Sequence, residues 1–600
     1  MNTVPQKQSG EPMYGWCDLP WTKFERQVFK LQKRIYRASL RGDVRAVHKL
    51  QRLLVKSWSA RCLAVRRVTQ DNRGKRTAGV DGVASLTPKR RLRLAERLAL
   101  NGKAQPLRRV WIPKPGSKEE KRPLGIPTMH DRALQALLKL ALEPEWEARF
   151  EPNSYGFRPG RSCHDAIQAI QVAIHIKAKY VLDADIAKCF DRVEHGALLE
   201  KLSTTPTFRR TVKGWLEAGI MVGEELFPTA EGTPQGGVIS PLLANVALHG
   251  LEDHIRSAFP RTKGARRELW QPRVIRYADD FVVLHPDLAT IEQTKRLTEE
   301  WLAGMGLELK PGKTRISHTL NEHDGNVGFD FLGFEVRQHR TGNTHSAKST
   351  YGEPLGFSTI IRPSKEAQRR HLASIKEIIH SHKAAPQVAH PRITALNPVI
   401  RGWANYYRSF NSTKVFSRMG HFVYLKLWRW AKRRHLRKSR RWVANKYWNV
   451  EQGKGWNFAS SEYGVWLQRH SDIHVQRHTK VKGRRSPYDG DWVYWATRMG
   501  RHPELPNRVA KLLQRQKGRC LWCGLYFKDG DLLEVDHKIP TAKGGEDLPS
   551  NWQLLHGSCH DEKTALDFSA AGDVHDKDRT VEEPDEGKLS RPVLETSRRG

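Results

Sequence analysis

The sequence predicts a multidomain α+β protein, and three observations lead to that fold class. Its 600 residues exceed what one hydrophobic core serves, given about 100 to 200 residues per domain. Short β-rich runs alternate with helical patterns from about residue 70 to 360, and helical patterns dominate after 364. Near the carboxyl end, two Cys/His pairs have the spacing of a zinc site, which indicates a small metal-stapled domain.

Helical periodicity accounts for most of the elements expected outside the β-rich runs. The first 20 residues carry Pro, Gly, Gln and Ser and are read as a loop. The residues from about 570 are polar and lack periodicity, which predicts disorder. The main expected helical segments are Trp21 to about Val68, which is rich in Lys and Arg, Asp131–Ala148, Thr290–Gly304, Ser364 to about His382, and Pro398–Trp442.

The charge of the chain points to a polyanionic partner. Lys and Arg total 103 against 64 Asp and Glu, a formal net charge of +39. Nucleic acid is the economical candidate. A membrane-surface protein is the competing interpretation, but no run of about 18 apolar residues exists and the basic residues are not confined to one amphipathic helix.

The cellular compartment is predicted from two observations, one on the amino-terminal residues and one on the cysteines. The first 25 residues have no apolar signal core, and the seven cysteines do not suggest a disulfide framework. We expect a cytoplasmic, nucleoid-associated location for a bacterial chain, with an organelle left open, and no membrane partner.

Two adjacent carboxylates at a predicted hairpin turn are the most informative local feature. Asp279 and Asp280 stand between the apolar stretches Val274–Ile275 and Phe281–Leu284. Neighbouring aspartates repel, and a buried pair is tolerable mainly when a hard divalent cation neutralises it. An exposed Asp-Asp turn is the alternative. Because a second predicted strand delivers Asp185, the chemistry favoured is two-metal phosphoryl transfer with Mg²⁺.

Six short motifs follow one another in a fixed order along the chain. They are Thr77–Gly82, Arg122–Pro127, Ser154–Arg158, Thr233–Gly237, Tyr277–Asp280 and Phe331–Phe334. With them the chain resembles reverse transcriptases, and more narrowly the proteins encoded by group II introns, over roughly residues 20 to 480. The resemblance implies the fingers and palm of a right-hand polymerase, followed by an α-helical thumb, or maturase, region.

The resemblance also implies roles for individual polymerase residues. Asp185 and Asp279 would ligate both Mg²⁺ ions, and Asp280 would contribute to the same cluster. Phe190 would form the wall that excludes a 2′-hydroxyl, with ordinary core packing as the alternative. The other nucleotide-binding residues would be Lys114 and Arg122, which grip the triphosphate, Gln235, which supports the nucleotide or template strand, and Lys313, near the leaving group.

A second stretch resembles the maturase domain of the same family. Leu396–Tyr407 would bind intron RNA through Arg401, Asn405 and Tyr407. Two aromatic residues of this stretch, Trp403 and Tyr406, are alternatively part of the core.

Downstream of it, one segment is basic and aromatic at once. Lys426–Arg441 holds nine Lys and Arg residues and no acid. Three of its cations, Arg433, Arg434 and Arg437, are predicted to contact RNA phosphates, with generic solubility as the alternative. Three interleaved tryptophans either pack inward or stack on unpaired bases; they are Trp428, Trp430 and Trp442.

The carboxy-terminal cysteines have zinc-site spacing. Cys520 and Cys523 form one pair, and His556 and Cys559 form the other. A redox pair is the alternative for the first two, but no thioredoxin-like context surrounds them. His556 departs from the commoner four-cysteine pattern, which tetrahedral Zn²⁺ accepts.

Between and beside these pairs, the sequence resembles the HNH endonuclease motif and its ββα-metal fold. The resemblance implies that His537 is the general base and that Asp536 and His560 hold a catalytic divalent ion. Asn551 would orient the base or its loop.

Together the resemblances imply a multifunctional group II intron-encoded protein that supports retrohoming. It would act as RNA-directed DNA polymerase, intron RNA maturase and HNH DNA endonuclease, with intron RNA, target DNA and deoxynucleoside triphosphates as partners. The alternatives are a domesticated reverse transcriptase and an RNA-binding splicing cofactor with vestigial enzymatic sites.

The expected domains are a basic helical arm at 1–68, fingers and palm at 69–360, a thumb or maturase domain at 361–480, a DNA-binding linker region at 481–512, the HNH domain at 513–568 and a disordered tail at 569–600.

Overall fold

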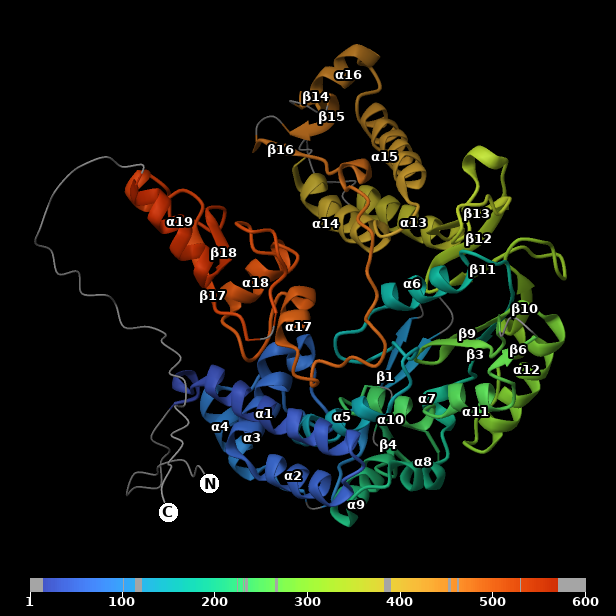
Figure 1. The fold of residues 1–600 in the computed structure, drawn as a ribbon, viewed down its shortest axis with the longest axis vertical. Coiled ribbons are helices and arrows are strands. Elements are labelled where there is room, and N and C mark those ends of the chain that lie inside the picture. Colours follow the sequence, from blue (N-terminus) through green and yellow to red (C-terminus); the bar gives the residue numbers. More distant parts are fainter. Residues whose placement is uncertain are drawn as a thin grey trace, which may run out of the picture. The chain divides into compact units, whose positions relative to one another are not determined.

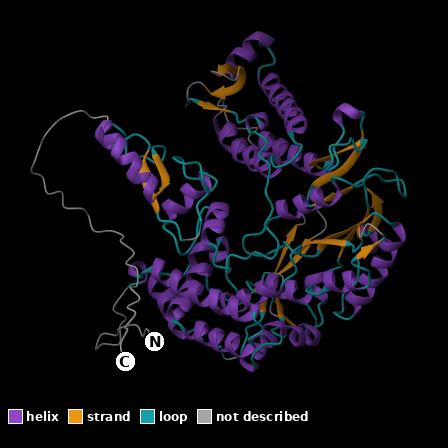
Figure 2. Ribbon diagram, viewed as in Figure 1, coloured by secondary structure: helices purple, strands orange, loops and turns teal. Residues whose placement is uncertain are grey.

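Two units are seen in this computed structural model, one ending at Asp491 and the other beginning at Trp492 (Figure 1). Both contain helices and strands, as Figure 2 shows, so the predicted multidomain, mixed α/β organisation is confirmed. The structure describes residues 15–100, 102–113, 121–223, 225–229, 231–232, 236–264, 268–381, 390–451, 455–460, 463–528 and 530–569. In these residues no helix combines the length and apolarity needed to cross a membrane.

The first unit begins with helices that pack on one long helix, α5. Ile35, Leu54 and Trp146, from three of these helices, are completely buried in the shared core. The Asp43 side chain caps α2 by accepting the Ala46 N–H at 2.9 Å. The helices of this region confirm the predicted helical segments Trp21 to about Val68 and Asp131–Ala148. The helices are α1 (Trp21–Leu40), α2 (Val44–Lys56), α3 (Trp58–Arg66), α4 (Pro88–Arg97) and α5 (Met129–Arg149).

An antiparallel four-stranded sheet, in the order β10-β3-β9-β8, carries the predicted carboxylates. The apolar residues of its strands, such as Val181 and Val283, are buried between helices that contact the sheet. Its strands are β3 (Tyr180–Asp185), β8 (Arg273–Tyr277), β9 (Asp280–His285) and β10 (Arg315–His318), and the contacting helices are α6 (Cys163–Ile174) and α12 (Leu288–Ala303). The predicted strand at 181–186 and helix at 290–304 are confirmed.

Smaller elements complete this part of the first unit. A second sheet has the order β2-β1-β4-β5, with β1 (Leu107–Pro113), β2 (Lys121–Ile126), β4 (Ile220–Val222) and β5 (Glu225–Phe227). The remaining elements are α7 (Cys189–Arg192), α8 (His195–Leu202), α9 (Pro206–Leu216), α10 (Ser240–Ala247), α11 (Leu251–Ser257), β6 (Thr262–Lys263), β7 (Glu268–Leu269) and the 3₁₀ helix η4 (Pro311–Lys313).

A three-stranded sheet leads into the helical region that the sequence predicts. Its strands are β11 (Phe329–Phe331), β12 (Phe334–Arg340) and β13 (Phe357–Pro363). The helices that follow are α13 (Lys365–Ser381), α14 (His390–Tyr407), α15 (Thr413–Arg434) and α16 (Arg440–Tyr447). Pro398 lies inside α14 instead of starting a helix, because Ile393, Leu396 and Ile400 bury one continuous helical face on both sides of it.

A small sheet after α16 does not follow from the expected helical pattern. It consists of β14 (Trp448–Glu451), β15 (Gly455–Ser460) and β16 (Val465–Trp466). Trp448 and Phe458 pair across it and pack against the core of α14 and α15. Tertiary burial of these aromatic residues explains a sheet that local periodicity does not reveal.

In the described residues of the second unit, two strands pack with three α-helices. Ala510, Leu513 and Leu554 are completely buried in its core, so α18 belongs to this unit together with the strands. The elements are α17 (Trp492–Met499), α18 (Asn507–Arg515), β17 (Leu533–His537), β18 (Trp552–His556) and α19 (Gly557–Ser569). The predicted disordered tail from 570 lies outside the described residues.

Candidate functional sites

The β8–β9 hairpin brings the three predicted aspartates to one edge of the central sheet. Tyr277 pairs with Asp280, so Ala278 and Asp279 form a two-residue turn, and Ala278 takes a φ of +59°. On the neighbouring strand Asp185 stands directly opposite Asp280. The hairpin predicted from the two apolar stretches that flank the aspartates is confirmed.

The electrostatics of this edge favour a bound cation. Burial raises the pKa of Asp280 to about 7, and the charges of Asp279 and Asp185 act in the same direction. Burial also raises the pKa of Asp279, while Arg122 and Lys313 act against that rise. Asp279 and Asp280, whose pKa values are raised, lie beside Asp185, and such a crowded set of carboxylate oxygens suits Mg²⁺.

Lys313 contributes a positive charge at this edge of the sheet. Its Nζ lies 2.8 Å from Oδ2 of Asp185, and η4 carries it there. Among the described residues, the three aspartates do not form a metal-binding group as tight as the thiolate cluster of the second unit. Lys313 therefore forms an ion pair with one of the three aspartates, and its role near the leaving group stays a prediction.

A loop and a buried arginine hold the turn, and sequence reasoning assigned them no function. A Cβ on Gly156 would lie 2.3 Å from the backbone N of Ala278, so only glycine allows this approach. Asn245 Nδ2 donates to the Gly156 carbonyl at 2.8 Å, and Arg276 Nη1 donates to Asn245 Oδ1 at 3.0 Å. Arg276 also donates to the Ala278 carbonyl at 3.2 Å. The local sequence does not single out Arg276, because the same strand begins with a second arginine, Arg273.

The structure describes some of the residues predicted to bind the nucleotide and not others. Phe190, in α7, makes an edge contact with Phe157, their ring centroids 6.3 Å apart. Phe157 is 48% exposed and has a φ of +59°, so this aromatic pair borders the surface. Arg122 lies exposed on β2. Lys114 and Gln235 lie outside the described residues.

The predicted RNA contacts on α14 divide into surface and core positions. Arg401 and Asn405 are exposed. Tyr407 is only 6% exposed, and its ring packs on Phe334 with centroids 4.9 Å apart, which leaves it unable to stack on a base from outside. The two residues with a core alternative, Trp403 and Tyr406, pack partly buried against the same core.

The basic segment is not one continuous helix. Arg433 and Arg434 end α15, whereas Arg437 lies in the link to α16. The tryptophans also divide, because Trp428 and Trp430 pack against the core while Trp442 is 37% exposed between lysines. Core packing thus describes two of the three tryptophans.

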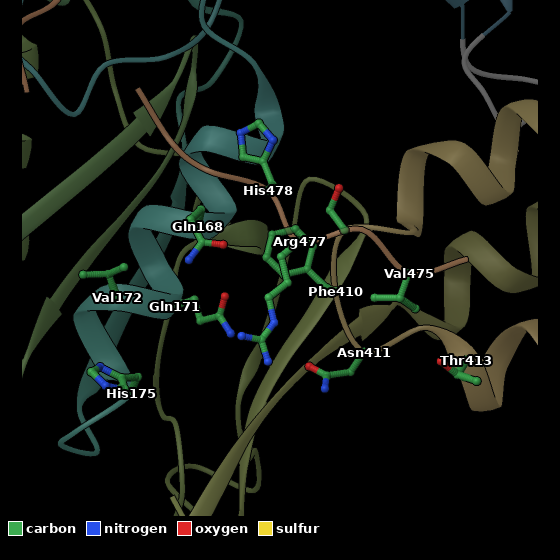
Figure 3. A pocket seen from close by; sticks show the side chains of 11 residues that line it. Gln168, Gln171, Val172, His175, Phe410, Asn411, Thr413, Val475, Arg477 and His478 are labelled. Carbon is green, nitrogen blue, oxygen red and sulfur yellow. The ribbon is translucent and has the colours of Figure 1, made fainter. Parts of the chain in front are cut away.

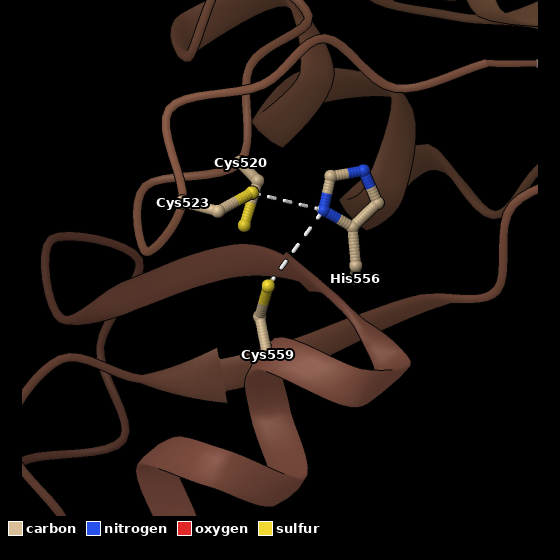
Figure 4. A group of neighbouring side chains, drawn as sticks. All are labelled: Cys520, Cys523, His556 and Cys559. Carbon is tan, nitrogen blue, oxygen red and sulfur yellow. Dashed lines mark hydrogen bonds between the residues drawn. The ribbon is translucent and has the colours of Figure 1, made fainter.

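The second unit assembles the four predicted zinc ligands. Ligand atoms of Cys520, Cys523, His556 and Cys559 all lie within 4.8 Å of one another (Figure 4). Burial would raise the pKa of Cys520, but backbone hydrogen bonds lower it to about 7. A thiol that ionises readily beside two further sulfurs and an imidazole fits Zn²⁺.

The predicted nuclease residues gather at the opposite end of β17. His537 ends the strand, and Asp536 Oδ1 lies 3.9 Å from His560 Nε2 on α19. Lys563 Nζ lies 3.1 Å from the other oxygen of Asp536. Asn551 fastens the loop after the strand, since its amide accepts from the Ile539 N–H at 3.0 Å and donates to the Ile539 carbonyl at 2.9 Å.

Asp547 is a site residue that sequence reasoning missed. Its Oδ1 lies 2.9 Å from His537 Nε2 and accepts the Trp552 indole N–H at 2.5 Å. Trp552 faces His537 across the β17–β18 pair, and Arg508 covers its ring at 3.9 Å. An acid in a polar loop gives no sequence signal by itself, whereas the strand register places it against the histidine.

Comparisons with known proteins match four families along the chain. The model described as reverse transcriptase (RNA-dependent DNA polymerase) matches residues 112–336, and the N-terminal domain of reverse transcriptase matches 16–98. The group II intron, maturase-specific domain matches 368–448. HNH endonuclease matches 520–566.

Individual relatives extend these matches. Protein YkfC of Escherichia coli is 34% identical over 56% of this chain and 91% of its own length. The group II intron-encoded protein LtrA of Lactococcus lactis is 28% identical over 54% of this chain and 63% of its own length, so the match spans less than two-thirds of LtrA. Maturase-like protein 1 of Euglena gracilis is 28% identical over 65% of this chain.

Proposed function

This chain belongs to the group II intron-encoded proteins, with reverse transcriptase, maturase and HNH endonuclease domains, and we propose from that premise which side chains carry each activity. We propose that the activities act in sequence during retrohoming. The endonuclease would nick target DNA, and the polymerase would copy intron RNA from the exposed 3′-hydroxyl. The observation that carries the proposal is the register that sets Asp185 opposite Asp280, with Asp279 at the adjoining turn.

For the polymerase, we assign the metal-holding role to these three aspartates. Asp185, Asp279 and Asp280 would hold two Mg²⁺ ions, which would supply activation of the primer hydroxyl and stabilisation of the leaving pyrophosphate. Arg122 is suited to bind the triphosphate, because its charge acts to lower the pKa of Asp279 and so is felt at the proposed metal site. Phe190 is suited to contact the sugar because it borders the surface beside Phe157. Lys114 and Gln235 stay predictions for the same substrate.

For the nuclease, we propose that His537 takes a proton from water. Asp547 would hold the imidazole in place through its contact with the Nε2 atom. Asp536 and His560 would hold the catalytic divalent ion, and Lys563 keeps Asp536 oriented toward α19. Asn551 would fix the loop that carries the base. The Cys₃His cluster would hold structural Zn²⁺.

For RNA binding, the proposed contacts are the exposed positions of the maturase region. Arg401 and Asn405 lie on α14, and the cations at the end of α15 extend the same basic character. They would meet phosphates of intron RNA. We also propose that the nuclease domain includes α17 and α18 besides 513–568, because α18 contributes to its core.

Primer extension on an RNA template tests the proposal against a vestigial splicing cofactor. With Mg²⁺ and deoxynucleotides, the full chain should extend a DNA primer annealed to RNA. The same preparation should nick a supercoiled plasmid that carries the target site. A chain that binds intron RNA but neither extends nor nicks would support the splicing-cofactor alternative instead.

A further inference from the structure

In the first unit, a polar cavity lies where three segments distant in sequence meet, and none of its lining residues belongs to the candidate sites described above. Its volume is about 590 Å³. Gln168 and Gln171 line it from α6, Asn411 from the turn between α14 and α15, and Arg477 and His478 from a later extended segment (Figure 3). Figure 3 shows the Arg477 side chain reaching between Gln171 and Asn411.

Hydrogen bonds to neighbouring elements fix the walls of this cavity. The buried Asp165 carboxylate accepts the Val481 N–H at 2.8 Å and lies 3.0 Å from His478 Nε2, which ties the late segment to α6. At its other end, the Gln476 N–H donates to the Arg408 carbonyl at 2.9 Å. The cavity is therefore preformed, and a ligand would not have to order its walls.

The lining chemistry selects the class of ligand. None of the residues that line the cavity is acidic, in a chain with a net charge of +39. Asn411 accepts the Ile361 N–H at 3.2 Å through its amide oxygen, which leaves its NH₂ as a donor. Gln168 and Gln171 each offer a donor and an acceptor, and Arg477 offers a guanidinium. A lining with a guanidinium, several amides and no carboxylate suits an anion that also has hydrogen-bonding edges.

We propose that this cavity binds one unpaired nucleotide of the RNA partner. Arg477 would hold the phosphate, and the amides of Gln168, Gln171 and Asn411 would hydrogen-bond the base edge. The volume lies within the range of about 300–1,000 Å³ that is typical of small-ligand sites. The inference rests on the proposed function, since it takes RNA as the partner.

The position of the cavity gives the bound nucleotide a consequence for the domains. α6 lies within the reverse transcriptase match at 112–336, and Asn411 lies within the maturase match at 368–448. A nucleotide bound in this cavity would contact the reverse transcriptase domain and the maturase domain at the same time. Binding RNA at this point would therefore stabilise the arrangement of the two domains within the first unit.

Binding of a 4-thiouridine-containing single-stranded RNA to the full chain tests the proposal, with a duplex RNA of the same sequence as the comparison. Two pocket variants are measured, the double variant Gln168→Leu/Gln171→Leu and the single variant Arg477→Ala. Gln293→Leu and Arg296→Ala, on the exposed part of α12, serve as matched controls. Primer extension from a supplied primer should stay unchanged in all four, which shows that they are folded.

Each pocket variant should bind the single-stranded RNA about tenfold more weakly and leave duplex binding unchanged. Arg477→Ala should lower the salt slope by about 1, whereas the glutamine variant should not alter it. Photocrosslinks should map to the α6 wall. The proposal is overturned if the pocket variants bind like their controls, or if both RNAs lose affinity equally. Failure of the unaltered chain to bind intron RNA would instead contradict the proposed function.

Discussion

The reactive residues of both sites depend on neighbours that have little chemistry of their own. Gly156 makes room for the turn that carries Asp279, and Asp547 holds the imidazole of His537. Such residues differ from the metal ligands and bases, because they act through another side chain. Their contribution is to keep a reactive group in one orientation, and loss of such a partner typically lowers activity by about 10- to 100-fold.

Asp547→Asn tests this orienting role in the nuclease. The amide keeps the shape but loses the charge-assisted contact to His537, so nicking should slow by about 10- to 100-fold. Zinc content and primer extension should stay at the level of the unaltered chain. Glu546→Gln, the neighbouring exposed position, is the control and should nick normally. Equal nicking by Asp547→Asn and Glu546→Gln would remove Asp547 from this role.

Phe190→Ala tests the proposed wall against the sugar. Without the ring, a 2′-hydroxyl meets no steric barrier, and discrimination against ribonucleotides should fall by about tenfold or more. Single-nucleotide incorporation with matched ribo- and deoxynucleotides measures this discrimination. Phe157→Ala, which removes only the ring beside Phe190, should change discrimination less. Unaltered discrimination in Phe190→Ala would assign the ring to packing alone.

At the scale of elements, local sequence patterns predicted part of what the structure contains, and long-range packing explains elements that they missed. Helical periodicity predicted α5 and α12, and the apolar stretches on either side of Asp279 and Asp280 predicted the β8–β9 hairpin. α14 continues through Pro398 because its buried face outweighs one lost hydrogen bond. The β14–β16 sheet arises from aromatic residues whose partners are distant in sequence. Metal-ligand spacing likewise predicted the Cys₃His cluster, whereas Arg276 and Asp547 depend on strand register that no local pattern reveals.

Gly156→Ala probes how closely the loop supports the hairpin. The added methyl group would overlap the backbone of Ala278, which costs about 1–3 kcal/mol of stability or displaces the turn. Polymerase activity should drop strongly while plasmid nicking persists. Gly420→Ala, in α15 with open space around it, should leave both activities intact. A Gly156→Ala protein with normal polymerisation would show that the turn does not need this contact.

Replacing Arg433, Arg434 and Arg437 together with Gln tests the basic segment as an element. If each contacts one phosphate, the slope of log affinity for intron RNA against log salt should flatten by about 2. Protein-assisted splicing should weaken in parallel. The control replaces three cations of α9, namely Arg209, Arg210 and Lys213. A slope equal to that of the control variant would place the RNA contacts elsewhere.

At the scale of the whole molecule, two units carry chemistry that can be separated. The aspartates lie in the unit that ends at Asp491, whereas the Cys₃His cluster and the residues proposed for the nuclease reaction lie in the unit that begins at Trp492. The second unit has a small core of its own, so its stability should depend on zinc. The first unit has extensive cores and no such dependence is expected of it.

Cys523→Ser tests the dependence of the second unit on zinc. Loss of one thiolate should release the metal and unfold this unit, because binding free energy and folding free energy are linked at such sites. Metal analysis and limited proteolysis would report both effects, and nicking should be lost. Cys17→Ser, at an exposed cysteine of the first unit, should retain zinc. A Cys523→Ser protein that stays folded without zinc would contradict a structural role for the cluster.

Target-primed synthesis by Asp279→Ala and His537→Ala proteins tests most directly the claim that one chain holds two separable reactions. Each variant is given intron RNA, target DNA, Mg²⁺ and deoxynucleotides, and nicked DNA and new DNA are measured separately. Asp279→Ala should nick but make no DNA, even from a supplied primer. His537→Ala should fail to nick, keep its zinc and extend the supplied primer normally. Normal synthesis by Asp279→Ala, or normal nicking by His537→Ala, would contradict this division of the chemistry.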